Sequence, residues 1–299
     1  MNNMEFDDDV IDMTDRSGGM IDKDSCLTRD FWERGSLEDC FILDFHAHMH
    51  HLSSMYLPAY SSELMIEIMK RCNTKLTVFC SHIALGYAEF EEEYNLNVAK
   101  RYPEYFMAYH AIIPGRTDYK TAIARLEANS AYYLGMKMHA DSDTTPLTSD
   151  EYKPFLEYLN EKRLPVLLHT WGNSKYDGID IVAKLAENYP RATFICGHSF
   201  HDDWKNGAEL LKAHPNLIAE LTAVMDNRGA IELLCDAVGS ERILFGTDVP
   251  WFDTHHGIGA VLSAEITDDD RRNIFYRNGL RLLERLNVVP AALSGINEK

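Results

Sequence analysis

The sequence predicts an α/β protein whose strands close into a (β/α)8 TIM barrel. Its 299 residues suit a single barrel domain, because such domains commonly run to about 250 residues. About eight apolar segments each precede an amphipathic segment, an alternation that is typical of parallel βα units. The apolar segments are nearly continuous, as expected of parallel strands buried on both faces. An open doubly wound sheet would carry a GxGxxG turn after its first strand, but that turn reads His46-Ala47-His48-Met49.

The elements follow from this alternation in chain order. Strands are expected at Phe41–Phe45, Leu76–Cys80, Tyr105–Ala111, Leu134–Met138, Pro165–Leu168, Thr193–Cys196, Leu217–Leu221 and Ile243–Phe245. Helices are expected at Glu63–Arg71, Glu91–Arg101, Tyr119–Ala128, Ser149–Lys162, Ile179–Asn188, Asp203–Ala213, Ala230–Val238 and, last, from about Asp268 to Leu286. Thr267, with Asp270 three residues later, resembles a capping box and predicts the start of the last helix.

The chain divides into two parts by composition. Residues 1–38 are polar and acidic and lack sustained periodicity, which predicts an N-terminal extension. Partial disorder and packing along the domain surface are both open alternatives for this extension. Residues 39–299 form the single predicted barrel domain.

Charge and cysteine usage restrict the function and the compartment. The formal net charge of −18 and the pI of about 5.1 argue against nucleic acid or an anionic membrane as partner. A small-molecule substrate is expected, and a homodimer is the commonest default assembly. The six cysteines form no CxxC pair, which favours reduced thiols in a cytoplasmic protein. Neither a secretory signal nor an apolar stretch of membrane-spanning length is expected.

Potential metal ligands end four of the predicted strands. His46 and His48 end the first strand, His169 the fifth, His198 the sixth and Asp248 the eighth. Alternate residues of a strand share a face, so His46 and His48 can point at one ion. The active site of a TIM barrel lies at the carboxyl-terminal ends of its strands. Imidazoles and a carboxylate with an open coordination position are typical of a catalytic divalent metal, so the sequence predicts such a site here.

Several motifs, together with these positions, carry a resemblance to a known family. The chain from about residue 41 to its end resembles the amidohydrolase superfamily, and within it the amidohydrolase family 2 branch that includes aminocarboxymuconate-semialdehyde decarboxylase. The matching segments are His46-Ala47-His48, Gly135-Met136-Lys137-Met138-His139, His169, Gly197-His198, Gly246-Thr247-Asp248-Val249-Pro250 and the tail Arg277-Asn278-Gly279-Leu280-Arg281-Leu282-Leu283. These motifs are specific for the superfamily and only loosely specific for a reaction.

The resemblance implies an amidohydrolase-type barrel with one metal ion, usually zinc. Its ligands would be His46, His48, His169 and Asp248. Asp248 would also accept a proton from water, and His198 would serve as a catalytic acid or base. A structural metal is disfavoured, because structural zinc sites are usually closed and rich in thiolates.

Lys137 leaves the number of metals open. Binuclear relatives carry a carboxylated lysine at the end of the fourth strand, which bridges two metals. Lys137 fits that pattern, and His169 and His198 would then bind the second ion. The single-metal interpretation is preferred because the surrounding segments resemble the mononuclear branch.

Residues at the same rim are candidates for substrate binding. Lys137 can pair with a substrate carboxylate, and Arg116, after the third strand, can do the same. His139, Trp171 and Trp251 are candidates for the pocket wall. The expected reaction is hydrolysis of an ester, lactone or amide by metal-activated water. The alternative is non-oxidative decarboxylation of an unsaturated or aromatic carboxylic acid with the same metal ligands.

Overall fold

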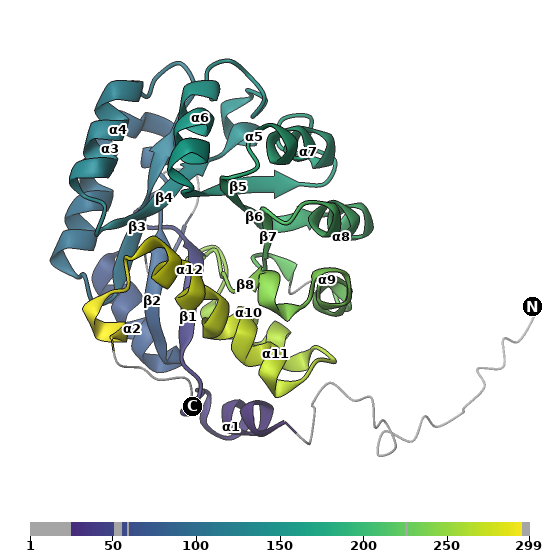
Figure 1. Cartoon of the computed structure of the whole chain (residues 1–299). Coiled ribbons are helices and arrows are strands. Elements are labelled where there is room, and N and C mark those ends of the chain that lie inside the picture. The colour runs from purple at the N-terminus through teal and green to yellow at the C-terminus, as the bar shows by residue number, and fades with distance from the viewer. Residues whose placement is uncertain (1–24, 51–55, 59, 225–226, 295–299) are drawn as a thin grey trace, which may run out of the picture.

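The fold is a closed barrel of eight parallel strands. The computed structural model describes residues 25–50, 56–58, 60–224 and 227–294, except the side chains of residues 87–91. The strands pair in chain order (Figure 1): β1 (Ile42–Ala47), β2 (Thr74–Phe79), β3 (Phe106–Ile112), β4 (Tyr133–Met138), β5 (Pro165–Trp171), β6 (Thr193–His201), β7 (Leu217–Glu220) and β8 (Ile243–Leu244). The chain closes the barrel after β8, where Phe45 N donates to Phe245 O at 2.9 Å and His48 N donates to Val249 O at 2.7 Å.

Helices cover the outside of the strands in the predicted alternation (Figure 1). They are α1 (Cys26–Arg34), α2 (Ser62–Cys72), α3 (Ala84–Arg101), α4 (Tyr119–Ala128), α5 (Ala140–Asp143), α6 (Lys153–Lys162), α7 (Ile179–Asn188), α8 (Trp204–Ala213), α9 (Ala230–Val238), α10 (Thr254–Ser263), α11 (Asp268–Arg272) and α12 (Asn278–Leu286). The predicted (β/α)8 fold is therefore confirmed. None of the described helices is long and apolar enough to cross a membrane.

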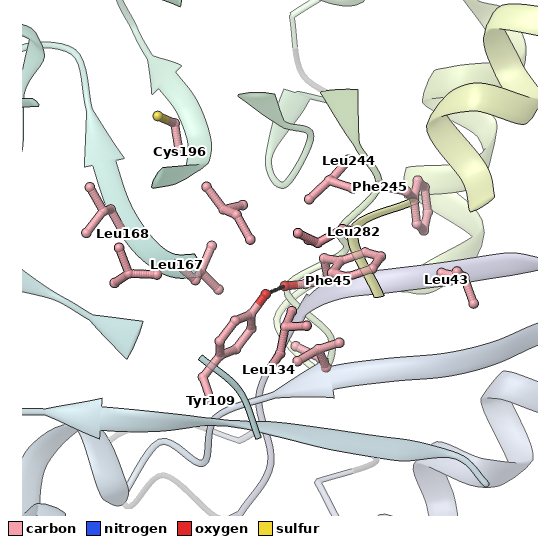
Figure 2. Packing of buried hydrophobic residues seen from close by; sticks show 14 of the residues in the cluster. Leu43, Phe45, Tyr109, Leu134, Leu167, Leu168, Cys196, Leu244, Phe245 and Leu282 are labelled. Carbon is pink, nitrogen blue, oxygen red and sulfur yellow. Dashed lines mark hydrogen bonds between the residues drawn. The ribbon is translucent and has the colours of Figure 1, made fainter. Parts of the chain in front are cut away.

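The core explains why the strands are so apolar. Every residue of β1, β3, β4 and β6 is buried, because one face of each strand lines the barrel interior and the other packs on helices. Figure 2 shows Tyr109 of β3 reaching across the interior to β1. Its hydroxyl donates to the carbonyl oxygen of Phe45 at 3.0 Å, which satisfies the one polar atom of this buried ring.

The helices differ from the prediction in several places: α1 and the short α5 were not expected, and α3 begins at Ala84 rather than Glu91. Helix α10 was not expected after β8; Asp253 caps it, and two glycines, Gly257 and Gly259, weaken its sequence signal. The predicted last helix is divided into α11 and α12 by a π-helical turn at Asn273–Arg277. The capping box of Thr267 and Asp270 is confirmed at the start of α11.

Part of the N-terminal extension is ordered against the barrel. Ser25 caps α1, and Leu27 on that helix is fully buried. The hydroxyl of Ser25 and the backbone N–H of Cys26 both donate to the carboxylate of Asp268, at the start of α11. Residues 1–24 lie outside the described residues, and the boundary between 38 and 39 stays a prediction.

Candidate metal centre

Closure of the barrel brings together three potential ligands from its two terminal strands. The ligand atoms of His46, His48 and Asp248 all lie within 4.8 Å of one another. Asp248 Oδ1 is 3.0 Å from His48 Nε2 and 3.5 Å from His46 Nε2. All three residues are buried. The backbone sets this arrangement, because the N–H groups of Thr247 and Asp248 both donate to the carbonyl oxygen of His46.

A second carboxylate, that of Asp44, links the first strand by hydrogen bonds to the segment that follows the eighth strand. Its Oδ1 accepts the backbone N–H groups of His46 and Thr247, and its Oδ2 accepts the hydroxyl of Thr247 at 2.6 Å. Burial raises the pKa of Asp44 to about 7, although the Thr247 hydrogen bond favours ionisation. Asp248 follows with φ of 62°, a left-handed conformation that is uncommon outside glycine. No role was predicted for Asp44 from the sequence.

Three histidines at the rim each form a hydrogen bond through their Nδ1 atom to an oxygen behind them. Nδ1 of His46 lies 2.8 Å from Glu220 Oε2, and Nδ1 of His48 lies 2.8 Å from the carbonyl oxygen of Cys80. Nδ1 of His169 lies 2.9 Å from Asp177 Oδ2. A carbonyl oxygen only accepts hydrogen bonds, so Nδ1 of His48 carries a proton, and in the neutral imidazole Nε2 then presents its lone pair. Such anchoring is typical of metal-binding histidines.

The polar atoms of the centre fit a divalent cation. Asp248 Oδ1 is buried and accepts no hydrogen bond from the described part of the chain. It faces the Nε2 lone pair of His48, so two acceptors share one region and repel each other unless a cation or an additional proton lies between them. Burial, followed by the charge of Lys137, holds the pKa of His46 well below its ordinary value, so this imidazole is in the neutral, ligating form. Two imidazole nitrogens and a carboxylate oxygen suit zinc or manganese.

Lys137 approaches the same centre from the fourth strand. It is fully buried, and its Nζ lies 3.1 Å from His46 Nε2. Burial lowers the pKa of Lys137, and the charge of Asp248 opposes that effect. Lys137 thus lines the cavity beside the potential ligands. Both of its predicted roles, a cation for the substrate and a carboxylated bridge between metals, stay predictions.

His169 and His198 lie on the wall next to the three ligands. The rings of His169 and His198 are 4.8 Å apart between centroids, and those of His46 and His198 are 5.1 Å apart. His169 lies outside the group whose ligand atoms are mutually within 4.8 Å, so its role as a fourth ligand stays a prediction. His198 Nδ1 is buried and has no hydrogen-bond partner in the described chain. Its catalytic role likewise stays a prediction.

A cavity of about 430 Å³ opens above these residues. It is lined by His46, His48, His82, Leu85, Gly86, Lys137, His139, Ser142, His169, Trp171, His198, Ala223, Asp248, Trp251 and Phe252. Four of the five predicted substrate-binding residues lie here: Lys137, His139, Trp171 and Trp251. The structure does not place Arg116 in the lining; its side chain is exposed and donates to the carbonyl oxygen of Gly86 at 2.9 Å.

The acids that hold His46 and His169 from behind were not predicted from the sequence. Glu220 and Asp177 are fully buried, and neither lines the cavity. A carboxylate inside the apolar predicted strand Leu217–Leu221 was an available signal for Glu220. Asp177 lies in a loop and had no comparable signal. His82, at the end of the second predicted strand and predicted as a pocket wall, lines the cavity: it stacks on His48 at 4.6 Å and accepts a hydrogen bond from Trp251 Nε1.

The barrel, the clustered histidines and aspartate, and the cavity above them define the architecture of a barrel enzyme. The chain belongs to the amidohydrolase family, because the model of that family, described as Amidohydrolase, matches residues 44–285. The resemblance seen in the sequence is thereby confirmed. No curated protein matches the chain.

Solved structures share the fold at low sequence identity. An uncharacterized TIM-barrel protein from Bordetella bronchiseptica is 18% identical, with a TM-score of 0.67 over 82% of this chain and 99% of that one. A 2,6-dihydroxybenzoate decarboxylase from Rhizobium is 15% identical, with a TM-score of 0.62 over 82% and 99%. A dihydroxybenzoic acid decarboxylase from Polaromonas with bound manganese is 13% identical, with a TM-score of 0.63 over 82% and 97%.

Proposed function

We propose that this protein catalyses the metal-dependent, non-oxidative decarboxylation of an unsaturated or aromatic carboxylic acid, with zinc or manganese as the metal. The charge of the cavity carries this proposal. Among the lining residues that the structure describes, Asp248 is the single acid and Lys137 the single lysine or arginine. Burial holds the pKa of His46, His82, His139 and His198 below the ordinary value, so the positive charge would come from Lys137 and the bound divalent metal. The whole chain has a net charge of −18, so the cavity departs from the rest of the molecule and suits an anionic substrate.

The walls of the cavity support a planar substrate. Trp171, Trp251 and Phe252 contribute aromatic surface. The ring of Trp171 is nearly parallel to that of His169, with an interplanar angle of 4° and 5.8 Å between centroids. A volume of about 430 Å³ lies within the range of small-molecule sites.

The similar solved structures favour decarboxylation over the hydrolysis that the sequence analysis ranked first. Several of them are named decarboxylases of hydroxylated aromatic acids, and one of these carries manganese where zinc had been expected. Their identities are below 20%, so this support adds to the charge and shape of the cavity rather than replacing them.

The residues divide the proposed reaction between them. His46, His48 and Asp248 would hold the metal, with His169 as the predicted fourth ligand. When bound, the metal would supply positive charge that binds a substrate oxygen and stabilises developing negative charge. Lys137 would pair with the substrate carboxylate at the cavity floor. His198, on the wall, would deliver a proton to the ring or alkene carbon as the carbon–carbon bond to carbon dioxide breaks.

Hydrolysis is the second candidate, favoured by one observation. Asp248 Oδ1 is a buried oxygen with no hydrogen-bond partner in the described chain, and it lies beside two metal-ligand candidates. A carboxylate in that position would accept a proton from an attacking water.

A substrate screen in deuterated water separates the two reactions. Aromatic and muconate-type carboxylic acids are tested beside esters and lactones, with apoprotein reconstituted in parallel with zinc and with manganese. Decarboxylation releases carbon dioxide and fixes one deuterium at the carbon that lost it. Turnover of esters or lactones, with the carboxylic acids unchanged, would reject decarboxylation in favour of hydrolysis.

A further inference from the structure

Glu220 connects two of the candidate functional histidines from behind the cavity. It ends β7, is fully buried and does not line the cavity. Its Oε2 lies 2.8 Å from Nδ1 of His46 and accepts the backbone N–H of His198 at 3.3 Å. Its Oε1 accepts the backbone N–H of Thr222 at 2.8 Å and the hydroxyl of Thr222 at 2.6 Å. One carboxylate therefore contacts β1, β6 and the segment after β7.

These contacts decide which atom of His46 carries the proton. Three donors from the chain already approach the two oxygens of Glu220, which makes the carboxylate an acceptor toward His46. Nδ1 of His46 therefore donates, and its Nε2 lone pair faces Asp248 and Lys137. A carboxylate behind an imidazole also raises its basicity as a ligand.

Two glycines of the sequence motifs make room for this pair. A Cβ atom on Gly246 would lie 1.8 Å from Oε1 of Glu220, which no side chain tolerates. A Cβ atom on Gly197 would lie 2.6 Å from the carbonyl oxygen of Leu168 and 3.1 Å from Cε1 of His46. The Glu220–His46 pair thus requires glycine at position 246, whereas glycine at position 197 is required first by the backbone of Leu168 and also borders His46.

The same carboxylate supports the turn that presents His198. Three consecutive residues there are left-handed without being glycine, with φ of 67° at His198, 45° at Ser199 and 62° at Phe200. Such conformations are costly and persist only where surrounding contacts enforce them. Glu220 holds the N–H of His198, and the hydroxyl of Ser199 donates to the backbone oxygen of Glu220 at 2.9 Å.

We propose that Glu220 is a positioning residue that fixes the tautomer and orientation of His46 as a metal ligand and holds the backbone of His198 at the cavity wall. This inference rests on the proposed metal centre and is independent of which reaction the protein catalyses. Glu220 itself does not line the cavity.

The test is the affinity of the apoprotein for Co²⁺, measured by competition with a chromophoric chelator and by the visible absorption of the bound ion. In Glu220→Gln, a single amide oxygen replaces two carboxylate oxygens as the acceptor for four donors: Nδ1 of His46, the N–H of His198, and the N–H and hydroxyl of Thr222. In either orientation of the amide, its own N–H groups face some of these donors. We expect the Kd for Co²⁺ to rise roughly 10- to 100-fold, with a changed absorption spectrum. The matched control is Glu92→Gln. Glu92 is also fully buried and accepts the N–H of Ala111 at 2.7 Å, but it lies on α3, away from the centre. The Kd of Glu92→Gln for Co²⁺ should stay within about twofold of the wild-type value.

Three outcomes would overturn the proposal. One is a Glu220→Gln variant with the affinity and spectrum of the wild type, and another is an equal loss of affinity in Glu92→Gln. If Glu220→Gln does not fold, Thr222→Val decides: it removes one donor to Glu220 and should raise the Kd several-fold, so an unchanged Kd would reject the role. Absence of Co²⁺ binding by the wild-type protein would overturn the metal centre as well, which distinguishes that failure from a failure of Glu220 alone.

Discussion

Nε2 of His48 lies 3.0 Å from Oδ1 of Asp248, although one residue follows the first strand of the barrel and the other follows the eighth. The barrel closes between these strands, so residues at opposite ends of the domain become neighbours. Nδ1 of His48 donates to the carbonyl oxygen of Cys80, so in the neutral imidazole Nε2 presents a lone pair toward the carboxylate. Two such acceptors at this distance require either a cation or an additional proton between them, and the first of these is a metal centre.

Removal of His48 should remove the metal and leave the barrel. In His48→Ala, the centre loses one of three ligands, whereas the barrel core of apolar side chains does not involve this imidazole. We expect loss of metal by elemental analysis, loss of activity, and a circular dichroism spectrum like that of the wild type. Full metal content in this variant would show that the ligands are other residues.

Lys137 should govern substrate affinity in a protein that holds one metal per chain. Its Nζ lies in the cavity, 3.1 Å from His46 Nε2, where it can pair with a substrate carboxylate. In Lys137→Met, we expect KM to rise at least about tenfold, the order of one hydrogen bond to a charged group, with metal content unchanged. Two metals per chain in the wild type, or a carbamate on Lys137 in a crystal structure, would establish the binuclear alternative instead.

His198 should affect the rate without affecting the metal. One positioned acid or base contributes roughly 10²–10⁴ in rate, so His198→Asn should lower kcat by that factor. Its ring lines the cavity, and its Nδ1 has no hydrogen-bond partner in the described chain. Metal content and kcat are measured on the same preparation. Loss of metal would make His198 a ligand, and unchanged kcat would leave it a structural role only.

Glu92 should make stability depend on pH. Burial raises the pKa of Glu92 in the folded protein from 4.5 to about 7, and a hydrogen bond from the N–H of Ala111 opposes this effect. The folded state therefore binds the proton more tightly, so its contribution to stability is full below about pH 4.5 and is lost as pH rises through about 7. Glu92→Gln cannot ionise and should lack this loss, which amounts to at most about 3 kcal/mol.

Urea unfolding of both proteins at pH 5 and pH 7.5 measures that difference. The variant should gain stability relative to the wild type at the higher pH. An equal change in both proteins between the two pH values would assign the pH dependence to other groups.

The sequence by itself determined the architecture and most of the rim. Parallel strands buried on both faces require continuous apolar segments, so all eight strands could be predicted from the apolar segments of the sequence. The carboxyl-terminal ends of parallel strands meet at one rim, so His46, His48 and Asp248 could be grouped from their positions in the chain alone. Lys137 could be added because Met136 and Met138 occupy the alternate face of its strand.

The tertiary structure alone decided which buried acid contacts which histidine, which rim residues line the cavity and where helix α1 packs. Glu220 reaches His46 from a position 174 residues away, and no spacing rule connects a buried acid to a particular imidazole. Arg116 follows the third strand and was expected at the rim. Its guanidinium donates to the carbonyl oxygen of Gly86 instead, and Arg116 does not line the cavity. Helix α1 is placed by hydrogen bonds to Asp268, which depend on contacts between the two ends of the chain. Periodicity records which face of an element is buried, whereas side-chain partners are selected by packing across the whole barrel.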